Sequence, residues 1–430
     1  MSQTARERLR GTWFVNARVP AALVNGFALR DTAAELAALD FGITADGALT
    51  SERGEARAVD LDGRIVLPTF VDSHVHLDKA YIVDRTGIPH GGLMDAVGLS
   101  IADASNRTVA DLQRRMTRAL ERAFQNGTSA MRTHLDTPVM PAQSPAWQVL
   151  CDMRQNWTDR IALQAVALMA LDRVDSPDFS ERCRQIAEFR GILGAFIVPG
   201  SATPERLDAL FRAAQDAGLT VDFHVDETLE PGANALELIC DSILRTGFAG
   251  QVVAGHCCSL RSATPEDRAR IIGKVAQSGV HIVSLPHSNL FLQDRVAGTT
   301  PARRGITAAR ELAAAGASIH FASDNVQDPF YPYGDFDMFD VFRTAVNAAH
   351  LHTDMIGWLA RQTQTAARAC GFDHHGRIVA GAPADLILFD ARTGQDLMSR
   401  PAQDRIVLRA GLPVQSSPLN LRELFAMEYS

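Results

Sequence analysis

The stretch that decides the fold is Val71-Asp72-Ser73-His74-Val75-His76-Leu77-Asp78. It closes an apolar run that begins at Ile65, a pattern typical of a buried strand. Side chains alternate between the two faces of a strand, so His74 and His76 point to the same face. Two imidazoles on one face at the end of a buried strand are half of a metal site, or else they merely line the strand end. The residues further along the chain favour the metal site.

From about residue 65 onward, short apolar runs alternate with helical patterns. The segments between the runs are amphipathic or rich in Ala, Arg and Glu, as at 108–126, 204–217, 264–278 and 305–315. Eight strands alternating with helices predict an α/β fold, a parallel closed (β/α)8 barrel of the TIM type. The predicted strands are Val66–His76, Ala130–Leu135, Ile161–Met169, Ile192–Val198, Thr220–Val225, Gln251–His256, His281–Leu285 and Ala317–Ala322.

The two ends of the chain differ from this middle part. Both carry short strand-like pieces with Gly and Asp turns, and Ala384–Phe389 reads as a strand. Two β-rich ends that flank a barrel can pair into one small β-sandwich domain. We therefore expect residues 1–66 and 376–430 to form the two parts of that domain, and residues 67–375 to form the barrel.

The composition is that of an ordinary globular protein, with 46% hydrophobic and 21% charged residues in a chain of 430. A net charge of −8 without a Lys/Arg cluster argues against a nucleic-acid partner. We expect no membrane association, because no apolar stretch reaches the roughly 18 residues that span a bilayer and no signal peptide is evident. The six cysteines show no disulfide spacing, which predicts a cytoplasmic protein with reduced thiols. Barrels of this size often form homo-oligomers, but no stretch of the chain marks an interface.

Polar residues at the ends of other predicted strands extend the metal-site hypothesis. Active sites of such barrels form where the strands end. His224 ends the fifth strand with Glu227 three residues later, and His256 ends the sixth. Asp324 follows the eighth strand. Imidazole and carboxylate ligands suit a divalent ion such as Zn²⁺ or Fe²⁺ and leave a position for a water molecule.

The residue types also suggest separate chemical roles. A divalent ion lowers the pKa of its water from 15.7 toward about 7, which supplies hydroxide at neutral pH. Glu227 fits a carboxylate that carries protons without binding the metal, and Asp324 fits a ligand that accepts the proton of the water. His256 fits a group that orients the hydroxide and stabilises developing negative charge.

At this point several motifs resemble the amidohydrolase superfamily and, within it, the branch that contains the cytosine deaminases. The similarity extends over nearly the whole chain from residue 60 to residue 390. The motifs are Leu67–Asp78, Arg132-Thr133-His134, Leu163-Gln164, His224–Glu227, Gly255-His256, Arg303–Thr307, Ser323–Pro332 and Ala380–Leu388.

The resemblance implies a (β/α)8 barrel with a small β-sandwich built from both termini. It also implies that Glu227 shuttles protons, that His256 lies beside the attacking hydroxide, and that Gln164, as the glutamine after the third strand, binds the substrate ring. Relatives with two metal ions carry a lysine at the end of the fourth strand; residues 195–200 here contain neither a lysine nor a carboxylate, so one divalent ion is favoured. The ligands that the resemblance implies are His74, His76, His224 and Asp324.

Two positions depart from the cytosine deaminases and bear on the substrate. Asn325 stands where those enzymes carry a second aspartate, and Phe330 where they carry a tryptophan. An amide donates as well as accepts hydrogen bonds, and a phenyl ring leaves more room than an indole, so a bicyclic pterin fits as well as a pyrimidine. We expect Asn325, Phe330 and Lys79 to contact the substrate. His134 either faces the pocket or has a structural role.

The leading functional prediction is a metal-dependent hydrolytic deaminase. Hydroxide attacks a ring carbon, Glu227 protonates the adjacent ring nitrogen, and ammonia leaves. The substrate is a small amino-substituted nitrogen heterocycle such as a cytosine-like pyrimidine or a pterin. The same residues would also serve an alkylamine-releasing triazine hydrolase or a cyclic-amide hydrolase. A catalytically silent ligand-binding barrel is a third reading, against which stands the completeness of the residue set.

Overall fold

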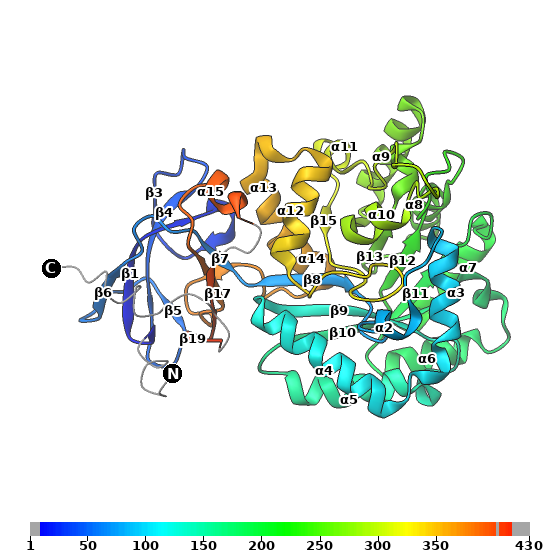
Figure 1. The fold of residues 1–430 in the computed structure, drawn as a ribbon, viewed down its shortest axis with the longest axis horizontal. Coiled ribbons are helices and arrows are strands. Elements are labelled where there is room, and N and C mark those ends of the chain that lie inside the picture. The colour runs from blue at the N-terminus through cyan, green and yellow to red at the C-terminus, as the bar shows by residue number, and fades with distance from the viewer. Residues whose placement is uncertain (1–8, 401–403, 415–430) are drawn as a thin grey trace.

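Eight parallel strands form the predicted barrel, each hydrogen-bonded to the next in chain order from β8 to β15. The computed structural model describes residues 9–400 and 404–414, and Figure 1 shows the barrel strands surrounded by helices. The strands are β8 (Phe70–Val75), β9 (Thr128–Asp136), β10 (Ala162–Ala170), β11 (Ile192–Phe196), β12 (Val221–Val225), β13 (Val252–His256), β14 (His281–Ser284) and β15 (Ile319–Phe321). The predicted TIM-type fold is confirmed.

Helices connect these strands, because parallel neighbours need a crossover. Three of the longer helices begin after a threonine whose hydroxyl oxygen accepts a backbone N–H of the first turn, at Thr108, Thr203 and Thr264. The predicted helix at 305–315 is shorter in the structure and spans Ala309–Ala314. The helices of the barrel are α2 (Val83–Thr86), α3 (Leu93–Ala102), α4 (Val109–Gln125), α5 (Pro145–Trp157), α6 (Phe179–Glu188), α7 (Pro204–Asp216), α8 (Ala235–Thr246), α9 (Pro265–Ser278), α10 (Pro286–Leu292), α11 (Ala309–Ala314), α12 (Met338–Ala349), α13 (Met355–Ala360) and α14 (Ala366–Cys370).

The barrel closes where its first and last strands meet, and that junction lies at the predicted site. Val75 at the end of β8 forms a parallel bridge with Asp324, just beyond β15. The backbone N–H of Asp324 donates to the carbonyl oxygen of His74 at 2.8 Å. Closure of the barrel therefore brings a carboxylate from one end of the sheet to the histidines of the other.

Strands from both ends of the chain pack together beside the barrel, at the left of Figure 1. A five-stranded sheet has the order β3-β4-β1-β6 with β5 paired to β4, a four-stranded sheet has the order β19-β18-β17-β7, and β16 pairs with β2. The elements are β1 (Thr12–Val19), β2 (Val24–Asn25), β3 (Leu29–Arg30), β4 (Ala37–Ile43), β5 (Leu49–Thr50), β6 (Arg57–Asp60), β7 (Val66–Pro68), β16 (Ile378–Val379), β17 (Leu386–Phe389), α15 (Gly394–Ser399), β18 (Arg405–Arg409) and β19 (Leu412–Pro413).

The four-stranded sheet is shared between two hydrophobic cores. Leu386 and Leu388 of β17 pack into the core of the small sheets, whereas Ile387 and Phe389 pack into the barrel core. This is the alternation of side chains that a strand buried on both faces requires. β7 spans residues 66–68, so the predicted boundary between residues 66 and 67 falls inside a strand. We propose that the two end segments form one small domain and that β7 joins it to the barrel.

None of the helices in the described part of the chain is long and apolar enough to cross a membrane. All six cysteines are free thiols, and five of them are buried. They pack as small apolar side chains, which is the usual role of a buried free cysteine.

Candidate metal centre and active site

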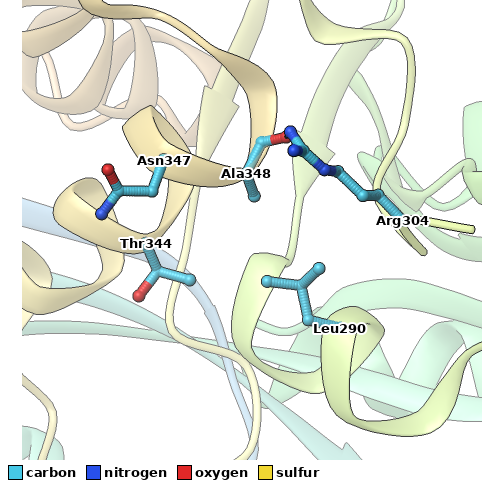
Figure 2. Close-up of a pocket in the computed structure, with 5 residues that line it drawn as sticks. All are labelled: Leu290, Arg304, Thr344, Asn347 and Ala348. Carbon is cyan, nitrogen blue, oxygen red and sulfur yellow. The ribbon is translucent and has the colours of Figure 1, made fainter. Parts of the chain in front are cut away.

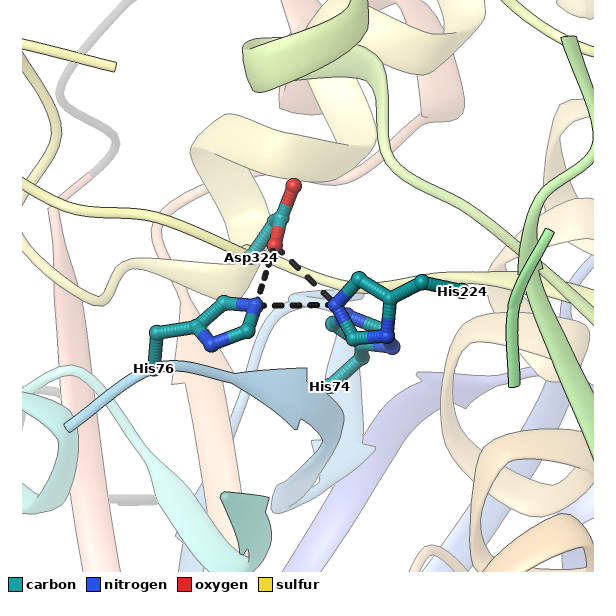
Figure 3. A group of neighbouring side chains, drawn as sticks. All are labelled: His74, His76, His224 and Asp324. Carbon is teal, nitrogen blue, oxygen red and sulfur yellow. Dashed lines mark hydrogen bonds and ion pairs between the residues drawn. The ribbon is translucent and has the colours of Figure 1, made fainter. Parts of the chain in front are cut away.

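Four side chains from three strand ends converge on one point, as Figure 3 shows. His74 lies on β8 and His76 directly after it, His224 lies on β12, and Asp324 follows β15. The Nε2 atoms of His74 and His76 lie 3.2 and 3.1 Å from Nε2 of His224. Oδ1 of Asp324 lies 3.6 Å from Nε2 of His74 and 3.3 Å from Nε2 of His76.

These distances fit a tetrahedral divalent ion. Ligand bonds of 2.0–2.1 Å place tetrahedral ligand atoms about 3.3–3.4 Å apart. Burial lowers the pKa of His74, His76 and His224 well below the usual range, so the three rings are neutral, which is the form that binds a metal. Three imidazole nitrogens at these separations cannot all hydrogen-bond one another, and a cation between them would satisfy their lone pairs together. The group therefore meets the geometric and chemical requirements of a metal site.

The backbone around the site is adapted to this arrangement. Asp324 and His256 adopt left-handed backbone conformations, with φ of 60° and 70°. Such conformations are strained for residues other than glycine and tend to occur at functional sites. Gly255 makes room for His74, because a Cβ at this position would lie 2.9 Å from Cε1 of the His74 ring.

Glu227 and His256 lie beside one another, next to the four-residue group. Oε1 of Glu227 is 3.4 Å from Nδ1 of His256. Burial, together with the nearby carboxylate of Asp324, raises the pKa of Glu227 well above its usual range. A carboxyl group with a raised pKa holds a proton more readily than an exposed one, which suits a group that carries protons. The structure therefore brings together six predicted residues: His74, His76, His224, Glu227, His256 and Asp324.

Asn289 of α10 also reaches Glu227 and His256, although no sequence pattern predicts it. Its Nδ2 lies 3.0 Å from Nδ1 of His256 and 3.4 Å from Oε1 of Glu227. The nearby Gln293 donates from Nε2 to the backbone carbonyl of Glu227 at 3.0 Å. A single asparagine carries no local sequence signal of such a contact, which depends on where α10 packs.

His134 lies within the barrel against the metal group, which is the set His74, His76, His224 and Asp324. Its ring lies against that of His74 at a centroid distance of 3.8 Å and a tilt of 30°, and its Nε2 lies 3.2 Å from Oδ1 of Asp222. Nη1 of Arg132 lies 3.0 Å from the other oxygen of Asp222. His74, His134 and Asp222 are close enough to hold an ion as well. Because Arg132 already neutralises Asp222, this second group is better suited to supporting His74 than to binding a second cation.

The predicted role of Gln164 is wrong. Gln164 lies near the beginning of β10, paired with Arg132 of β9, whereas the metal group lies where the barrel strands end. Its Oε1 accepts from Nε of Arg132 at 3.0 Å, and its Nε2 donates to the carbonyl oxygen of Cys370 at 2.8 Å. β10 continues to Ala170, so the glutamine does not follow the strand and its amide is already hydrogen-bonded inside the protein.

Asn325 is buried directly beside Asp324, and a neighbouring carboxylate orients its amide. Nδ2 of Asn325 donates to Oδ2 of Asp328 at 2.6 Å. Oδ1 of Asp328 accepts the backbone N–H groups of Phe330 and Tyr331 at 2.8 and 3.2 Å. The amide nitrogen of Asn325 thus faces Asp328, and its oxygen makes no hydrogen bond to the described residues. Asp328 therefore holds Asn325 in the orientation that leaves its amide oxygen available as an acceptor.

Lys79 and Phe330 lie together next to the metal group. Nζ of Lys79 is 5.4 Å from the centroid of the Phe330 ring and 2.7 Å from Oδ1 of Asp136. Burial acts to lower the pKa of Lys79, but Asp136 and Asp78 outweigh it and raise the pKa, so the amine is charged. The same charge helps to lower the pKa of His76, which places Lys79 within electrostatic reach of the site.

A cavity of about 370 Å³ between α10 and α12 lies apart from these residues, and Figure 2 shows its lining. None of the predicted site residues lines this cavity. Arg304 borders it and donates from Nη1 to the carbonyl oxygen of Ala348 at 2.6 Å. The lining residues are Leu290, Arg304, Thr344, Asn347 and Ala348.

Known proteins are similar to this chain in both sequence and fold. The model of the amidohydrolase family matches residues 117–415. A pterin deaminase from Rhizobium rhizogenes (strain K84) is 41% identical over 417 residues, which cover 95% of each chain. The chain belongs to the amidohydrolase family. The predicted resemblance is thereby confirmed over most of the length of this amidohydrolase.

Two further known proteins are similar to the amidohydrolase over most of its length. The N-isopropylammelide isopropyl amidohydrolase of Pseudomonas sp. (strain ADP) is 23% identical over 390 residues, 86% of this chain and 92% of that one. The crystal structure of 5-methylcytosine deaminase from Klebsiella pneumoniae superposes with a TM-score of 0.80 at 25% identity, covering 95% of this chain and 98% of that one. The prediction of an enzyme from the deaminase branch of the superfamily is confirmed.

Proposed function

We propose that this amidohydrolase removes the amino group of a pterin by hydrolysis. The observation that carries the proposal is the convergence of four ligand atoms beside Glu227 and His256. The 41% identical pterin deaminase supports the choice of ring. The oxygen of water bonds to the ring carbon that bears the amino group, the bond from that carbon to the amino nitrogen breaks, and the hydrogens of water leave with ammonia or remain on the dioxo ring.

We propose one divalent ion, Zn²⁺ or Fe²⁺, with His74, His76, His224 and Asp324 as its ligands. The chemistry that such an ion supplies is a lowered pKa of water, which yields hydroxide at neutral pH. A single ion is consistent with the pairing of Asp222 with Arg132 at 3.0 Å in the neighbouring group. It is also consistent with the end of β11, where residues 195–200 contain no lysine or carboxylate.

The protein side chains move the protons. Glu227 receives a proton from the attacking water and delivers it to the ring nitrogen next to the attacked carbon. A second transfer by the same carboxyl group protonates the amine, which then leaves as ammonia. The raised pKa of Glu227 suits both transfers. Asp324 assists as a proton acceptor, and the N–H of His256 stabilises the negative charge that develops on the attacking oxygen.

We further propose that Asn325, Phe330 and Lys79 contact the substrate. The amide oxygen of Asn325, oriented by Asp328, accepts a ring N–H of the pterin. Phe330 packs against the bicyclic ring. The ammonium group of Lys79 lies 5.4 Å from the centre of the Phe330 ring. A substrate that packs against Phe330 therefore lies near Lys79, and we expect one of its carbonyl oxygens to face this charge.

The proposal is tested by ammonia release from metal-loaded enzyme. The substrates are pterin, cytosine, 5-methylcytosine, isocytosine and an aminotriazine, with Glu227→Gln as the matched variant. We expect pterin to be deaminated fastest. We expect Glu227→Gln to retain its metal and to lose about 10²–10⁴-fold in kcat, the usual contribution of a general acid–base group. Full turnover by Glu227→Gln would refute the assigned proton shuttle.

The other hydrolytic reactions are outcomes of the same assay. Isopropylamine released from N-isopropylammelide, without ammonia from pterin, would favour the alkylamine-releasing alternative that one relative represents. A ring-opened acid from a cyclic amide would favour the amide hydrolase. The absence of turnover with all of these substrates would overturn the pterin proposal.

The cytoplasmic location and a homo-oligomeric state remain predictions. Six free cysteines fit a reducing compartment. Fractionation of cells and light scattering of the purified enzyme test the two predictions separately.

A further inference from the structure

We propose that Asn289 is a positioning residue that fixes the tautomer of His256, so that His256 presents an N–H at Nε2 to the reacting oxygen. The consequence for turnover rests on the proposed deaminase function. The tautomer itself does not, because it follows from contacts within the protein.

The amide of Asn289 is buried between two groups that determine its orientation. Asn289 is fully buried, and its Nδ2 lies 3.0 Å from Nδ1 of His256 and 3.4 Å from Oε1 of Glu227. A carboxylate oxygen accepts hydrogen bonds, so it favours the amide nitrogen at this position. The opposite orientation would place the amide oxygen against Oε1 of Glu227, with two acceptors facing each other. The contact with Glu227 therefore orients Asn289.

This orientation decides where His256 carries its proton. A neutral imidazole has one N–H and one nitrogen lone pair. Oε1 of Glu227 also lies near Nδ1 of His256, but at 3.4 Å, whereas Nδ2 of Asn289 lies at 3.0 Å, so the shorter contact decides. When Nδ2 of Asn289 donates to Nδ1 of His256, Nδ1 is the acceptor and Nε2 carries the hydrogen. Nε2 of His256 is buried and has no hydrogen-bond partner among the described residues. An unpartnered N–H beside the metal group is a donor available to an oxygen that gains negative charge in the transition state.

The helix that carries Asn289 is held in place on several sides. α10 follows β14 after a single residue, Leu285. Gln293 ties the end of the helix to the backbone of Glu227 at 3.0 Å. Gly305 packs so closely that a Cβ there would lie 2.4 Å from the carbonyl oxygen of Asn289. His287 adds a contact of 3.1 Å from its Nε2 to the hydroxyl of Thr344 on α12. These contacts limit how far Asn289 can move away from His256.

The tautomer can be measured directly in the full-length enzyme. Zn²⁺-loaded protein labelled with ¹⁵N-histidine gives a two-bond ¹H–¹⁵N correlation pattern that distinguishes the two neutral tautomers. The His256 signals are assigned by their loss in His256→Gln. We expect the pattern of an Nε2–H imidazole in the wild type. We expect Asn289→Asp to shift the proton to Nδ1 or to give the doubly protonated ring, because a carboxylate accepts and cannot donate.

Steady-state kinetics with pterin separate positioning from packing. Asn289→Asp and Asn289→Leu have nearly the shape of asparagine, but neither donates to Nδ1. We expect both to lower kcat by about 10²-fold, the loss typical of one oxyanion donor, with a smaller change in KM. Asn347→Asp is the matched control, because Asn347 is exposed on α12 and lines the cavity between α10 and α12. We expect this control to keep the wild-type tautomer and kcat.

The possible results separate the two proposals. An Nδ1–H pattern in the wild type would overturn the role of Asn289, and so would an unchanged tautomer and kcat in Asn289→Asp. If the wild type turned over no substrate, the proposed function would fail. The NMR pattern would still decide for or against the tautomer in that case.

Discussion

Gly255→Ala tests the metal centre through one added methyl group. A Cβ at residue 255 would lie 2.9 Å from Cε1 and 3.2 Å from Nδ1 of His74. Carbon atoms pack at about 3.5–4.0 Å, so the His74 ring must retreat by about 0.6 Å. Metal–ligand distances tolerate only about 0.2 Å, so His74 would no longer reach the position that it shares with His224. We expect the affinity for Zn²⁺ to fall by about 10–100-fold, the loss typical when the support of a ligand is damaged.

Competition with a chromophoric chelator measures this affinity, and circular dichroism confirms that the variant is folded. Gly273→Ala is the matched control, since residue 273 lies in α9 and a Cβ built there meets nothing within 4 Å beyond its chain neighbours and the backbone of its own helix. We expect this control to bind Zn²⁺ like the wild type and to be slightly more stable, because alanine favours a helix over glycine. Wild-type affinity in a folded Gly255→Ala protein would refute the placement of His74 as a ligand.

Three other predictions concern the substrate contact, acid stability and metal content. Asn325→Asp places a second carboxylate against Asp328 at a 2.6 Å contact, so we expect a lower melting temperature and a lower kcat/KM. Adding Asp328→Asn should restore both, and failure to restore them would contradict the assigned pair. Burial acts to raise the pKa of Asp111, but Arg85 and Arg115 outweigh it and hold the pKa below its usual range. The stability from this carboxylate is therefore present above about pH 4 and lost as the pH falls further, so urea unfolding of Asp111→Asn should show lower stability at pH 7 and a flatter loss below pH 4. Chelation should abolish turnover and one equivalent of Zn²⁺ should restore it, whereas a requirement for two equivalents would contradict a single-ion site.

The barrel and the metal group were predictable because both depend on local patterns. Apolar runs alternate with amphipathic segments, and His74 and His76 share a strand face through a spacing of two residues. The end of a strand is harder to locate from the sequence. The resemblance predicts that Gln164 follows the third strand, whereas β10 continues to Ala170, so the amide lies at the other end of the barrel.

The contacts of Asn289 and His134 could not be predicted, because they depend on how remote elements pack. Asn289 reaches His256 from a helix that follows the next strand along the chain. The ring of His134 contacts that of His74, sixty residues earlier in the chain, and neither residue carries a local signal of that contact. The orientation of Asn325 likewise depends on Asp328, which lies only three residues away but bonds to it through a folded loop.

The four-stranded sheet shared by the barrel core and the core of the small sheets affects the order in which the protein can fold during translation. Residues up to 370 contain every barrel strand and its helices, yet Ile387 and Phe389 fill part of the barrel core. These side chains are translated after the last barrel helix, so the nascent barrel emerges with an uncovered apolar surface. Incomplete chains with such a surface are prone to aggregate. We expect the newly made barrel to depend on chaperones until β17 is translated and adds itself to β7.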